Sequence, residues 1–397
     1  MAQPLRFGVA GIGNEGRAIV PYLEATENIL FSAAADLRED ALDALQEAHP
    51  QIKTFTSVVA MCQSGEVDAI WIATPNPVHA EHAIAAADAG IHVVLEKPMA
   101  ISLDQTHQMV EAVERNGTRL MLHSHASDPP IVKMREIIAS GRLGRLIGIS
   151  ALQYKAWLNS PRLAFELDTS LGGGVIFRQG PHQIEIARHL GGGLVKSVRA
   201  YTGRWHPTFQ TEGNYSALLE FADGTPASLV LHGYGYFIAT DLTWNIGEGG
   251  TAGSGEYRAR PRRLEPIEPA TYYATGGRAG TRSGTPRPES GREIGAQSSR
   301  MQPIYGLFIV SCENGEMRQS PNGIYVYTDD GCEEVICEPF QDKAHELQVM
   351  YESVRENKPL FPDARWGRAT LEVILAILES GRTHRDVTLE YQVPSPI

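Results

Sequence analysis

Short apolar runs alternate with amphipathic segments through the first 123 residues. The apolar runs are rich in Val, Ile and Ala, which predicts buried strands, and the segments between them repeat apolar residues every three or four positions, as helices do. The predicted strands are residues 5–10, 30–35, 52–55, 68–73, 91–95 and 119–123, and the predicted helices are residues 17–24, 39–48, 57–63, 78–89 and 102–115. Alternation of this length predicts an α/β fold with a doubly wound parallel sheet.

The pattern changes after residue 124. Longer segments that alternate apolar and polar residues follow, and these predict the strands of a second, large sheet. The predicted strands are residues 145–154, 194–206, 213–222, 226–235, 238–246, 304–311 and 323–337, and the predicted helices are residues 129–140, 342–356 and 367–380. We therefore expect two domains, residues 1–124 and residues 125–397.

Residues 247–302 have a different composition, dominated by Gly, Ser, Arg and Pro and with little periodicity. More than fifty residues without a pattern is long for a loop inside a compact domain. We interpret this segment as a mobile lid or as an arm that becomes ordered in an oligomer.

Composition narrows the range of partners and compartments. The chain has 397 residues and a formal charge of −12, which argues against nucleic acid or an anionic membrane as the main partner. Cys62, Cys312, Cys332 and Cys337 lack metal-binding spacing and predict free thiols in a reducing compartment. The N-terminus has no apolar signal region, and no apolar stretch is long enough to span a membrane. We expect a cytoplasmic protein.

The first predicted strand runs directly into the segment Gly11-Ile12-Gly13-Asn14-Glu15-Gly16, which a helix follows. This GxGxxG pattern between a strand and a helix is typical of a dinucleotide site, where glycines permit a tight turn and a close approach of the backbone to a pyrophosphate. The predicted cofactor contacts in this loop are Gly11, Ile12, Gly13, Asn14 and Gly16.

Asp36 ends the second predicted strand, 20 residues after Gly16. An acidic side chain at this distance typically binds the adenosine ribose hydroxyls of NAD and repels the 2′-phosphate of NADP. Arg38 leaves NADP as the alternative, because a guanidinium group can stack on adenine or neutralise a phosphate. A helix N-cap is the alternative role for Asp36.

Polar residues also follow the strands at 68–73 and 91–95. The first is followed by Thr74-Pro75-Asn76-Pro77-Val78-His79 and the second by Glu96-Lys97-Pro98. The carboxyl ends of parallel strands face the ligand crevice of such a sheet. We therefore expect cofactor contacts from Thr74, Pro75, Asn76, His79, Glu96 and Lys97.

Lys97 is also placed to reach a substrate, with Pro98 stiffening the backbone beside it. The alternative is a surface lysine in a strand-to-helix turn. His79 and His82 are three residues apart on a predicted helix, but the sequence places no third ligand near them, so we expect no metal site.

The glycine motif at 11–16, the segment Thr-Pro-Asn-x-x-His at 74–79 and Glu-Lys-Pro at 96–98 together resemble the glucose–fructose oxidoreductase/inositol dehydrogenase (Gfo/Idh/MocA) family, over essentially the whole chain. The resemblance implies an N-terminal Rossmann domain and a second domain with an open, mostly antiparallel sheet. It implies that Lys97 lies beside the nicotinamide and the substrate hydroxyl. It also implies a homodimer or homotetramer, formed through the outer face of the second sheet.

One position departs from the pattern of that family, in which a glycine run is followed by Asp and then Gly-x-His, with the Asp and His facing the substrate. Gly180 and His182 match, but Arg178 occupies the acidic position. A guanidinium group is suited to binding a carboxylate, which favours an anionic substrate over an ordinary sugar. Alternatively, a protein carboxylate pairs with Arg178, and the candidates in sequence are Glu166, Asp168 and Glu185.

Several segments also resemble phthalate dihydrodiol dehydrogenases, which oxidise a cis-diol on a ring that bears carboxylates. These segments include His123-Ser124-His125, Phe177-Arg178-Gln179-Gly180-Pro181-His182 and Ser311-Cys312-Glu313. His125 and Arg162 are further candidates for contact with the substrate.

We expect an NAD-dependent oxidation of a secondary alcohol on a small anionic molecule, most consistent with a carboxylated cyclic cis-diol. Lys97 and His182 are the candidate catalytic residues, and we favour His182 as the base because a histidine titrates near neutral pH without tuning. The alternatives are a sugar or inositol dehydrogenase, a lyase or hydrolase that retains NAD through a transient ketone, and an NAD-sensing protein without chemistry.

Overall fold

The computed structural model describes residues 3–253, 264–274 and 301–396, and these residues form two compact units. The first unit contains residues 3–123 and 341–368, and the second contains residues 124–253, 264–273, 301–340 and 369–396. One boundary lies near residue 124, as in the expected division. The grouping of residues 341–368 with the first unit differs from that division, which assigned them to the C-terminal domain.

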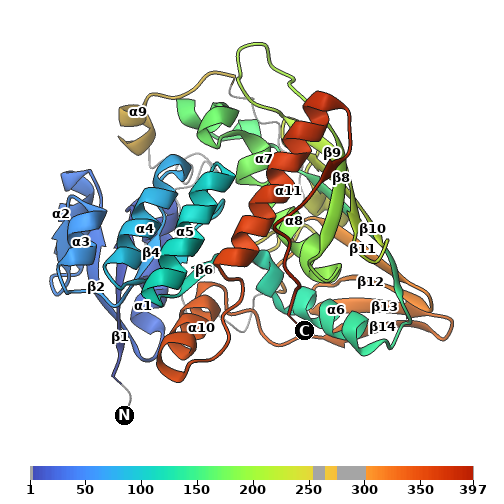
Figure 1. Cartoon of the computed structure of the whole chain (residues 1–397), viewed down its shortest axis with the longest axis horizontal. Helices are drawn as coiled ribbons and strands as arrows, with labels where there is room; N and C mark the ends of the chain where they lie inside the picture. Colours follow the sequence, from blue (N-terminus) through green and yellow to red (C-terminus); the bar gives the residue numbers. More distant parts are fainter. Residues whose placement is uncertain (1–2, 254–263, 275–300, 397) are drawn as a thin grey trace. The chain divides into compact units, whose positions relative to one another are not determined.

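The first unit is built on a six-stranded parallel sheet with the order β3-β2-β1-β4-β5-β6. Its strands are β1 (Leu5–Ala10), β2 (Ile29–Ala35), β3 (Lys53–Phe55), β4 (Ala69–Ile72), β5 (His92–Leu95) and β6 (Leu120–Leu122). The helices between them are α1 (Asn14–Ala25), α2 (Glu39–Ala48), α3 (Val58–Gln63), α4 (His79–Asp88) and α5 (Leu103–Asn116), with a 3₁₀ turn, η1 (Asn76–Val78), before α4. This arrangement confirms the predicted doubly wound sheet (Figure 1).

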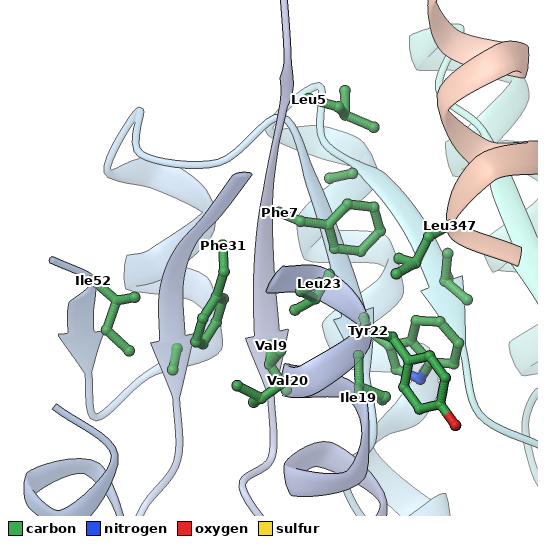
Figure 2. Close-up of a cluster of buried hydrophobic side chains, with 14 of the residues drawn as sticks. Leu5, Phe7, Val9, Ile19, Val20, Tyr22, Leu23, Phe31, Ile52 and Leu347 are labelled. Carbon is green, nitrogen blue, oxygen red and sulfur yellow. The ribbon is translucent and has the colours of Figure 1, made fainter. Parts of the chain in front are cut away.

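The core of the first unit explains why helix α10 (Lys343–Glu356) belongs to it. Phe7 on β1, Ile19 and Leu23 on α1 and Leu347 on α10 are all fully buried in one apolar cluster, which Figure 2 shows from close by. Residues that are more than 300 positions apart in sequence therefore share one core, and burial of their apolar area drives this part of the chain onto the sheet.

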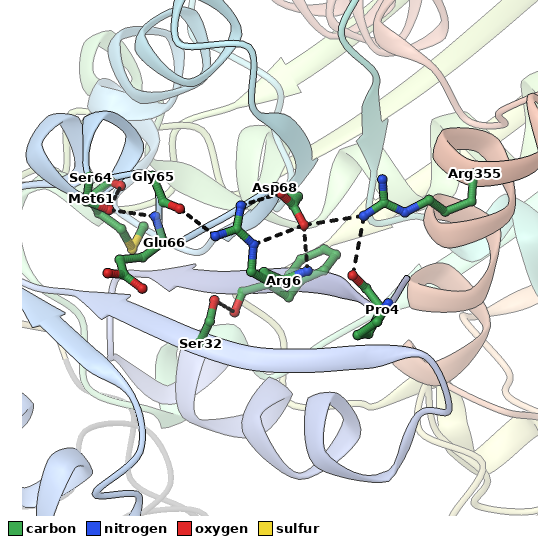
Figure 3. A network of polar contacts seen from close by, with 10 residues as sticks. Pro4, Arg6, Ser32, Met61, Ser64, Gly65, Glu66, Asp68 and Arg355 are labelled. Carbon is green, nitrogen blue, oxygen red and sulfur yellow. Dashed lines mark hydrogen bonds and ion pairs between the residues drawn. The ribbon is translucent and has the colours of Figure 1, made fainter. Parts of the chain in front are cut away.

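The two ends of α10 lie at opposite ends of the parallel strands. Near its C-terminal end, Arg355 donates hydrogen bonds to the Pro4 carbonyl (3.3 Å) and to Asp68 (3.4 Å), which precedes β4. Asp68 also accepts from Arg6 at 2.7 Å, and Figure 3 shows this network. The first turn of α10 meets residues that follow β5 and β6, as described below, so α10 runs antiparallel to the strands.

The second unit contains a nine-stranded sheet with the order β14-β13-β12-β11-β7-β10-β9-β8-β15. Among the described strand pairs of this second sheet, only that of β10 with β7 is parallel, which confirms a mostly antiparallel sheet. The strands are β7 (Leu146–Tyr154), β8 (Val195–Gly203), β9 (Asn214–Phe221), β10 (Pro226–His232), β11 (Leu307–Cys312), β12 (Gly315–Gln319), β13 (Gly323–Thr328), β14 (Gly331–Ile336) and β15 (Val387–Thr388).

The remaining helices of the described chain are α6 (Pro129–Ser140), α7 (Gly174–Arg178), α8 (Gly180–Leu190), α9 (Pro269–Ala274) and α11 (Ala364–Thr383), and the short 3₁₀ turns are η2 (His125–Ser127), η3 (Trp157–Asn159), η4 (Ala164–Leu167), η5 (Thr169–Leu171) and η6 (Ala239–Leu242). None of the described helices is both long and apolar enough to cross a bilayer. All four cysteines have free thiols.

Two predicted strands of the second unit are wrong in detail. Residues 238–246 form the 3₁₀ turn η6 and a bend in which Trp244 and Asn245 have positive φ angles, 52° and 58°. Residues 323–337 form a hairpin of β13 and β14 instead of one strand. Most of the predicted lid or arm, residues 254–263 and 275–300, lies outside the described residues.

We predict that Leu347→Ala destabilises the first unit by about 2–5 kcal/mol, because it leaves a cavity in that core. Denaturant unfolding followed by tryptophan fluorescence measures the change. Glu356→Ala, at the exposed end of the same helix, is the control and should change stability by roughly 0.5 kcal/mol or less. Equal effects of the two variants would contradict the assignment of α10 to this core.

Candidate active site

The glycine loop between β1 and α1 has the shape that a pyrophosphate needs. A Cβ atom at Gly16 would lie 1.9 Å from the Gly11 carbonyl oxygen, so only glycine allows the helix to pack this closely. Gly11 itself has a φ of +89°. A Cβ at Gly13 would meet no atom within 4 Å, so the backbone before the first turn of α1 is open to a ligand. The loop therefore fits a dinucleotide pyrophosphate at a helix N-terminus.

Asp36 and Arg38 lie beside this loop. The Asp36 carboxylate accepts from the Ile12 backbone N–H at 2.6 Å and from the Arg38 backbone N–H at 2.9 Å. The Arg38 guanidinium donates to Asp36 at 3.2 Å and to the Ile12 carbonyl at 2.9 Å. Asp36 does not cap α2, whose N-cap is Arg38. The pair thus ties the end of β2 to the glycine loop, where the adenosine ribose of a bound dinucleotide is expected.

His79 ties the turns that follow β4 and β5 together. It is 1% exposed, and its Nε2 and Nδ1 lie 2.7 Å and 2.8 Å from the carbonyl oxygens of Thr74 and Pro98. Burial lowers the pKa of His79, against the effect of both carbonyls and the Glu96 charge. Asn76 is 4% exposed. His79 therefore links the backbone that follows β4 to the backbone that follows β5.

Glu96 is buried where β5 ends. Its Oε1 lies 3.4 Å from the Lys343 ammonium and 3.4 Å from the indole nitrogen of Trp71, on β4. Lys343 lies over the Trp71 ring, 5.1 Å from its centroid. One turn further along α10, Glu346 lies 2.8 Å from Nδ1 of His123, which follows β6.

The charges of this group are mutually stabilised. Burial alone would raise the pKa of Glu96, but the positive charges of Lys343, His123 and Lys97 outweigh it and lower the pKa to about 2. Burial alone would lower the pKa of His123, but the Glu346 charge outweighs it and raises the pKa to about 9. At neutral pH the first unit therefore holds one buried ion pair, Lys343–Glu96, and one partly buried pair, His123–Glu346, and Glu96 directly precedes Lys97 in the chain.

In the second unit, His182 lies in a group of rings. It is 4% exposed on α8, and its ring centroid lies 4.5 Å from that of His125 and 4.9 Å from that of Tyr305. Nδ1 of His125 lies 2.8 Å from Asp128, which fixes the orientation of the His125 ring. The structure thus brings together two of the predicted substrate residues, His125 and His182.

Tyr305 and Lys155 are members of this group that the sequence did not predict. The Tyr305 hydroxyl donates to the Gln179 carbonyl at 2.6 Å, and Lys155 lies over the Tyr305 ring at 4.5 Å. Burial raises the pKa of Tyr305 well above its usual value, so the phenol stays protonated at neutral pH. Tyr305 follows a segment without periodicity, so no sequence signal indicated it.

Arg178 pairs with a protein carboxylate. Its Nε lies 3.1 Å from Glu166, which is buried. Arg162 lies 3.7 Å from the same carboxylate and stacks on Trp157, with its guanidinium 4.0 Å from the ring centroid. Of the three acidic residues considered from the sequence, Glu166 is thus the one that meets Arg178. Two guanidinium groups share one carboxylate, so these three residues carry a net charge of +1.

The predicted site residues are divided between the two units. The dinucleotide residues and Lys97 lie in the first unit, and His125, Arg162, Arg178 and His182 lie in the second. Within the described ranges, no cluster of three or more His, Cys, Asp or Glu side chains could hold a metal ion.

Comparison with known families agrees with both units. Residues 5–124 match a family model described as an oxidoreductase family with an NAD-binding Rossmann fold, and residues 131–243 match the GFO/IDH/MocA C-terminal domain. The chain belongs to the Gfo/Idh/MocA family of oxidoreductases. This confirms the resemblance noted in the sequence, and with it an NAD-binding oxidoreductase.

Individual relatives in the family differ in what they act on. The chain is 31% identical over 391 residues, 95% of both chains, to 1-carboxy-3-chloro-3,4-dihydroxycyclohexa-1,5-diene dehydrogenase from Comamonas testosteroni. It is 27% identical over 242 residues to D-glucoside 3-dehydrogenase from Escherichia coli, which covers 56% of this chain and 68% of the relative. A solved structure of a putative dehydrogenase from Bordetella bronchiseptica shares 32% identity and a TM-score of 0.84, over 98% of this chain and 100% of that one.

We predict that the enzyme prefers NAD over NADP by at least tenfold in kcat/KM, about 1.4 kcal/mol, because the Asp36 carboxylate repels a 2′-phosphate. Steady-state kinetics with both cofactors measures the ratio. Asp36→Asn keeps the hydrogen-bond acceptor without the charge and should narrow the preference. Equal or better use of NADP by the wild type would mean that Arg38 decides the cofactor.

We also predict a pH-dependent contribution of His123 to stability. Its folded pKa of about 9 exceeds the unfolded value of about 6.5, so this contribution is full below pH 6.5 and is lost as the pH rises through 9. Denaturant midpoints of the wild type and His123→Gln should therefore differ most near pH 6 and converge above pH 9. A difference that stays constant with pH would show that folding does not shift the pKa of His123.

Proposed function

We propose that this enzyme oxidises a secondary alcohol of a carboxylated cyclic cis-diol, similar to a phthalate dihydrodiol, with NAD as the hydride acceptor. The observation that carries the proposal is the Arg162–Glu166–Arg178 group, in which two guanidinium groups meet the buried Glu166 carboxylate and Arg178 stands where the family pattern has an acidic residue. Such a group favours an anionic ligand, since a carboxylate can form charge-assisted hydrogen bonds with guanidinium groups.

The relative from Comamonas testosteroni supports the same substrate class. Its name describes a ring with one carboxylate and two neighbouring hydroxyls, and its similarity to this chain extends over 95% of both proteins. A carboxylated ring substrate would use both features of the second unit, the cationic group for its carboxylate and the histidine group for its hydroxyls.

In the proposed reaction, the carbinol hydrogen leaves as a hydride and the hydroxyl hydrogen leaves as a proton. The carbon–hydrogen bond breaks with its electron pair, and NAD supplies the acceptor for that hydride. His182 takes the hydroxyl proton, and Lys97 polarises the hydroxyl by donating a hydrogen bond to its oxygen. Asp128 orients His125, whose ring contacts that of His182, and these contacts support a role for His125 in holding a second hydroxyl.

A sugar dehydrogenase is the second candidate. D-glucoside 3-dehydrogenase is among the relatives, so a neutral polyhydroxylated ring remains a substrate to test. NADH absorbance on a panel of carboxylated dihydrodiols, the same diols without carboxylates, and sugars and inositols separates the two. Turnover confined to the sugars would contradict the proposal.

Exposed apolar side chains and free thiols support the proposed oligomeric state and cellular compartment of the enzyme. Exposed apolar residues on the second sheet include Ile147 on β7, Leu218 on β9 and Ile309 on β11, between 37% and 48% exposed. These side chains support a homodimer or homotetramer formed through the sheet. Four free cysteines support a reducing cytoplasm.

We predict that Lys97→Ala and His182→Ala each lower kcat by roughly 10²–10⁴ with little change in NAD affinity, as expected for lost acid–base catalysis. Steady-state kinetics and NAD titration measure both quantities. If the two residues act on one step, the double variant should lose little more than the worse single variant. Near-normal turnover of either single variant would make that residue structural.

We predict that Arg178→Ala lowers kcat/KM for a carboxylated cis-dihydrodiol by roughly 30-fold or more, since a charge-assisted pair contributes about 2–5 kcal/mol when one partner is truncated. Activity on an uncarboxylated diol should hardly change. Glu166→Gln is the matched variant: it removes the competing negative charge and should lower KM for the carboxylated substrate. Equal losses on both substrates would assign Arg178 to the scaffold.

A further inference from the structure

Lys97 lies between two residues whose positions are fixed by the first unit. On one side, the Glu96 carboxylate contacts the Lys343 ammonium and the Trp71 indole, and the Glu96 backbone N–H donates to the Ile72 carbonyl at 3.0 Å. On the other side, the Pro98 carbonyl lies 2.8 Å from the His79 ring. The backbone that carries Lys97 is therefore held at both ends.

Lys343 is itself held in place by its own helix start. The residue before it, Asp342, has a φ of 53° and a ψ of −139°, a backbone conformation that residues other than glycine rarely adopt. Such a backbone is strained by about 1–3 kcal/mol and persists only where its surroundings enforce it. The Tyr22 hydroxyl donates to the Asp342 carboxylate at 2.7 Å and supplies part of that restraint.

The cost of burying Lys343 also points away from a purely structural role. The side chains of Lys343 and Glu96 are 6% and 8% exposed. A buried ion pair of this kind usually stabilises a fold no better than apolar residues of similar volume would, because both charges lose their hydration. Glu96 directly precedes the candidate catalytic residue Lys97, so this ion pair can fix the position of Lys97, which apolar packing could not do as specifically.

We propose that Lys343 is a positioning residue for this oxidoreductase, which fixes the Glu96 carboxylate and thereby the backbone that presents Lys97; the inference rests on the proposed role of Lys97. The other charged groups that face the Lys343–Glu96 pair come from three elements. Besides Lys97 itself, they are Glu15 on α1, Asp342 and Glu346 at the start of α10, and His123 after β6.

The first test compares turnover. Lys343→Met should lower kcat by roughly 10- to 100-fold, because small displacements of a reacting group are costly, while NAD affinity stays within about threefold. Lys343→Arg should restore most of the loss. Lys358→Met is the control, since this lysine beyond the end of α10 is 52% exposed and pairs with Glu352 and Glu356 at the surface, and it should leave kcat unchanged.

A charge-free pair separates positioning from stability. Glu96→Gln combined with Lys343→Met leaves neither charge buried alone, so this double variant should fold even where Lys343→Met does not. Under the proposal its thermal stability recovers and its kcat stays at least about tenfold low. Recovery of kcat together with stability, or a normal kcat in Lys343→Met, overturns the proposal.

A measurement without substrate keeps the inference separate from the proposed reaction. The rate at which an amine-directed acylating reagent modifies Lys97, followed by mass spectrometry, depends on the position and surroundings of that amine. In the Glu96→Gln/Lys343→Met double variant, the acylation rate of Lys97 should differ from that in the wild type by roughly threefold or more. The acylation rate of Lys358 in the same sample is the internal reference. An unchanged Lys97 rate refutes positioning, whereas a wild type inactive on every alcohol refutes only the proposed function.

Discussion

A carboxylate that is buried at the end of a strand requires a cation beside it, and much of the first unit depends on meeting this requirement. Glu96 follows β5 at the edge of the sheet where ligands bind in folds of this kind. Lys343 supplies the positive charge, and it reaches Glu96 because α10 is packed on the sheet through Leu347 and fixed at its other end by Arg355. The need of the Glu96 carboxylate for a nearby positive charge thus links the packing of α10, the strained residue at its start and the position of the Lys97 backbone.

The two units differ in how their charged side chains are paired. In the first, His123 and Lys343 balance Glu96 and Glu346, so these four side chains are neutral as a group. In the second, Arg162 and Arg178 share a single carboxylate. The balanced charges hold the first group in place, whereas the two guanidinium groups of the second are the basis of the proposed anionic substrate. This contrast fits a family in which the cofactor chemistry is constant and the ring substrate varies.

The local parts of the fold could be predicted from the sequence, because they depend on short-range patterns. Residues 5–16 contain the strand β1, the glycine turn and the start of α1 within about twelve residues. Residues 238–246 show where such patterns fail: their apolar side chains suggested a strand, but Ile238, Leu242 and Trp244 are 37–44% exposed and the backbone turns. Periodicity reports side-chain character, not whether a partner strand is present.

The candidate site was less predictable because its contacts are distant in sequence. Lys343 and Glu346 lie three residues apart on a helix, a spacing common on solvated helix faces, and no local signal indicates that both are buried. The partner of Arg178 could not be chosen among three nearby acidic residues without coordinates. Tyr305 and Lys155 meet only through the order of strands in the sheet.

The grouping of residues 341–368 with the first unit has a consequence for synthesis on the ribosome. The chain emerges from its N-terminus, so the strands through β6 are complete roughly 220 residues before α10 appears. At about 5–20 residues per second, this delay is on the order of 10–40 s. Throughout it, the apolar surface that Leu347 later covers stays open and Glu96 lacks its ion pair with Lys343. The nascent N-terminal domain is therefore a natural client for a chaperone, although the finished protein buries both features.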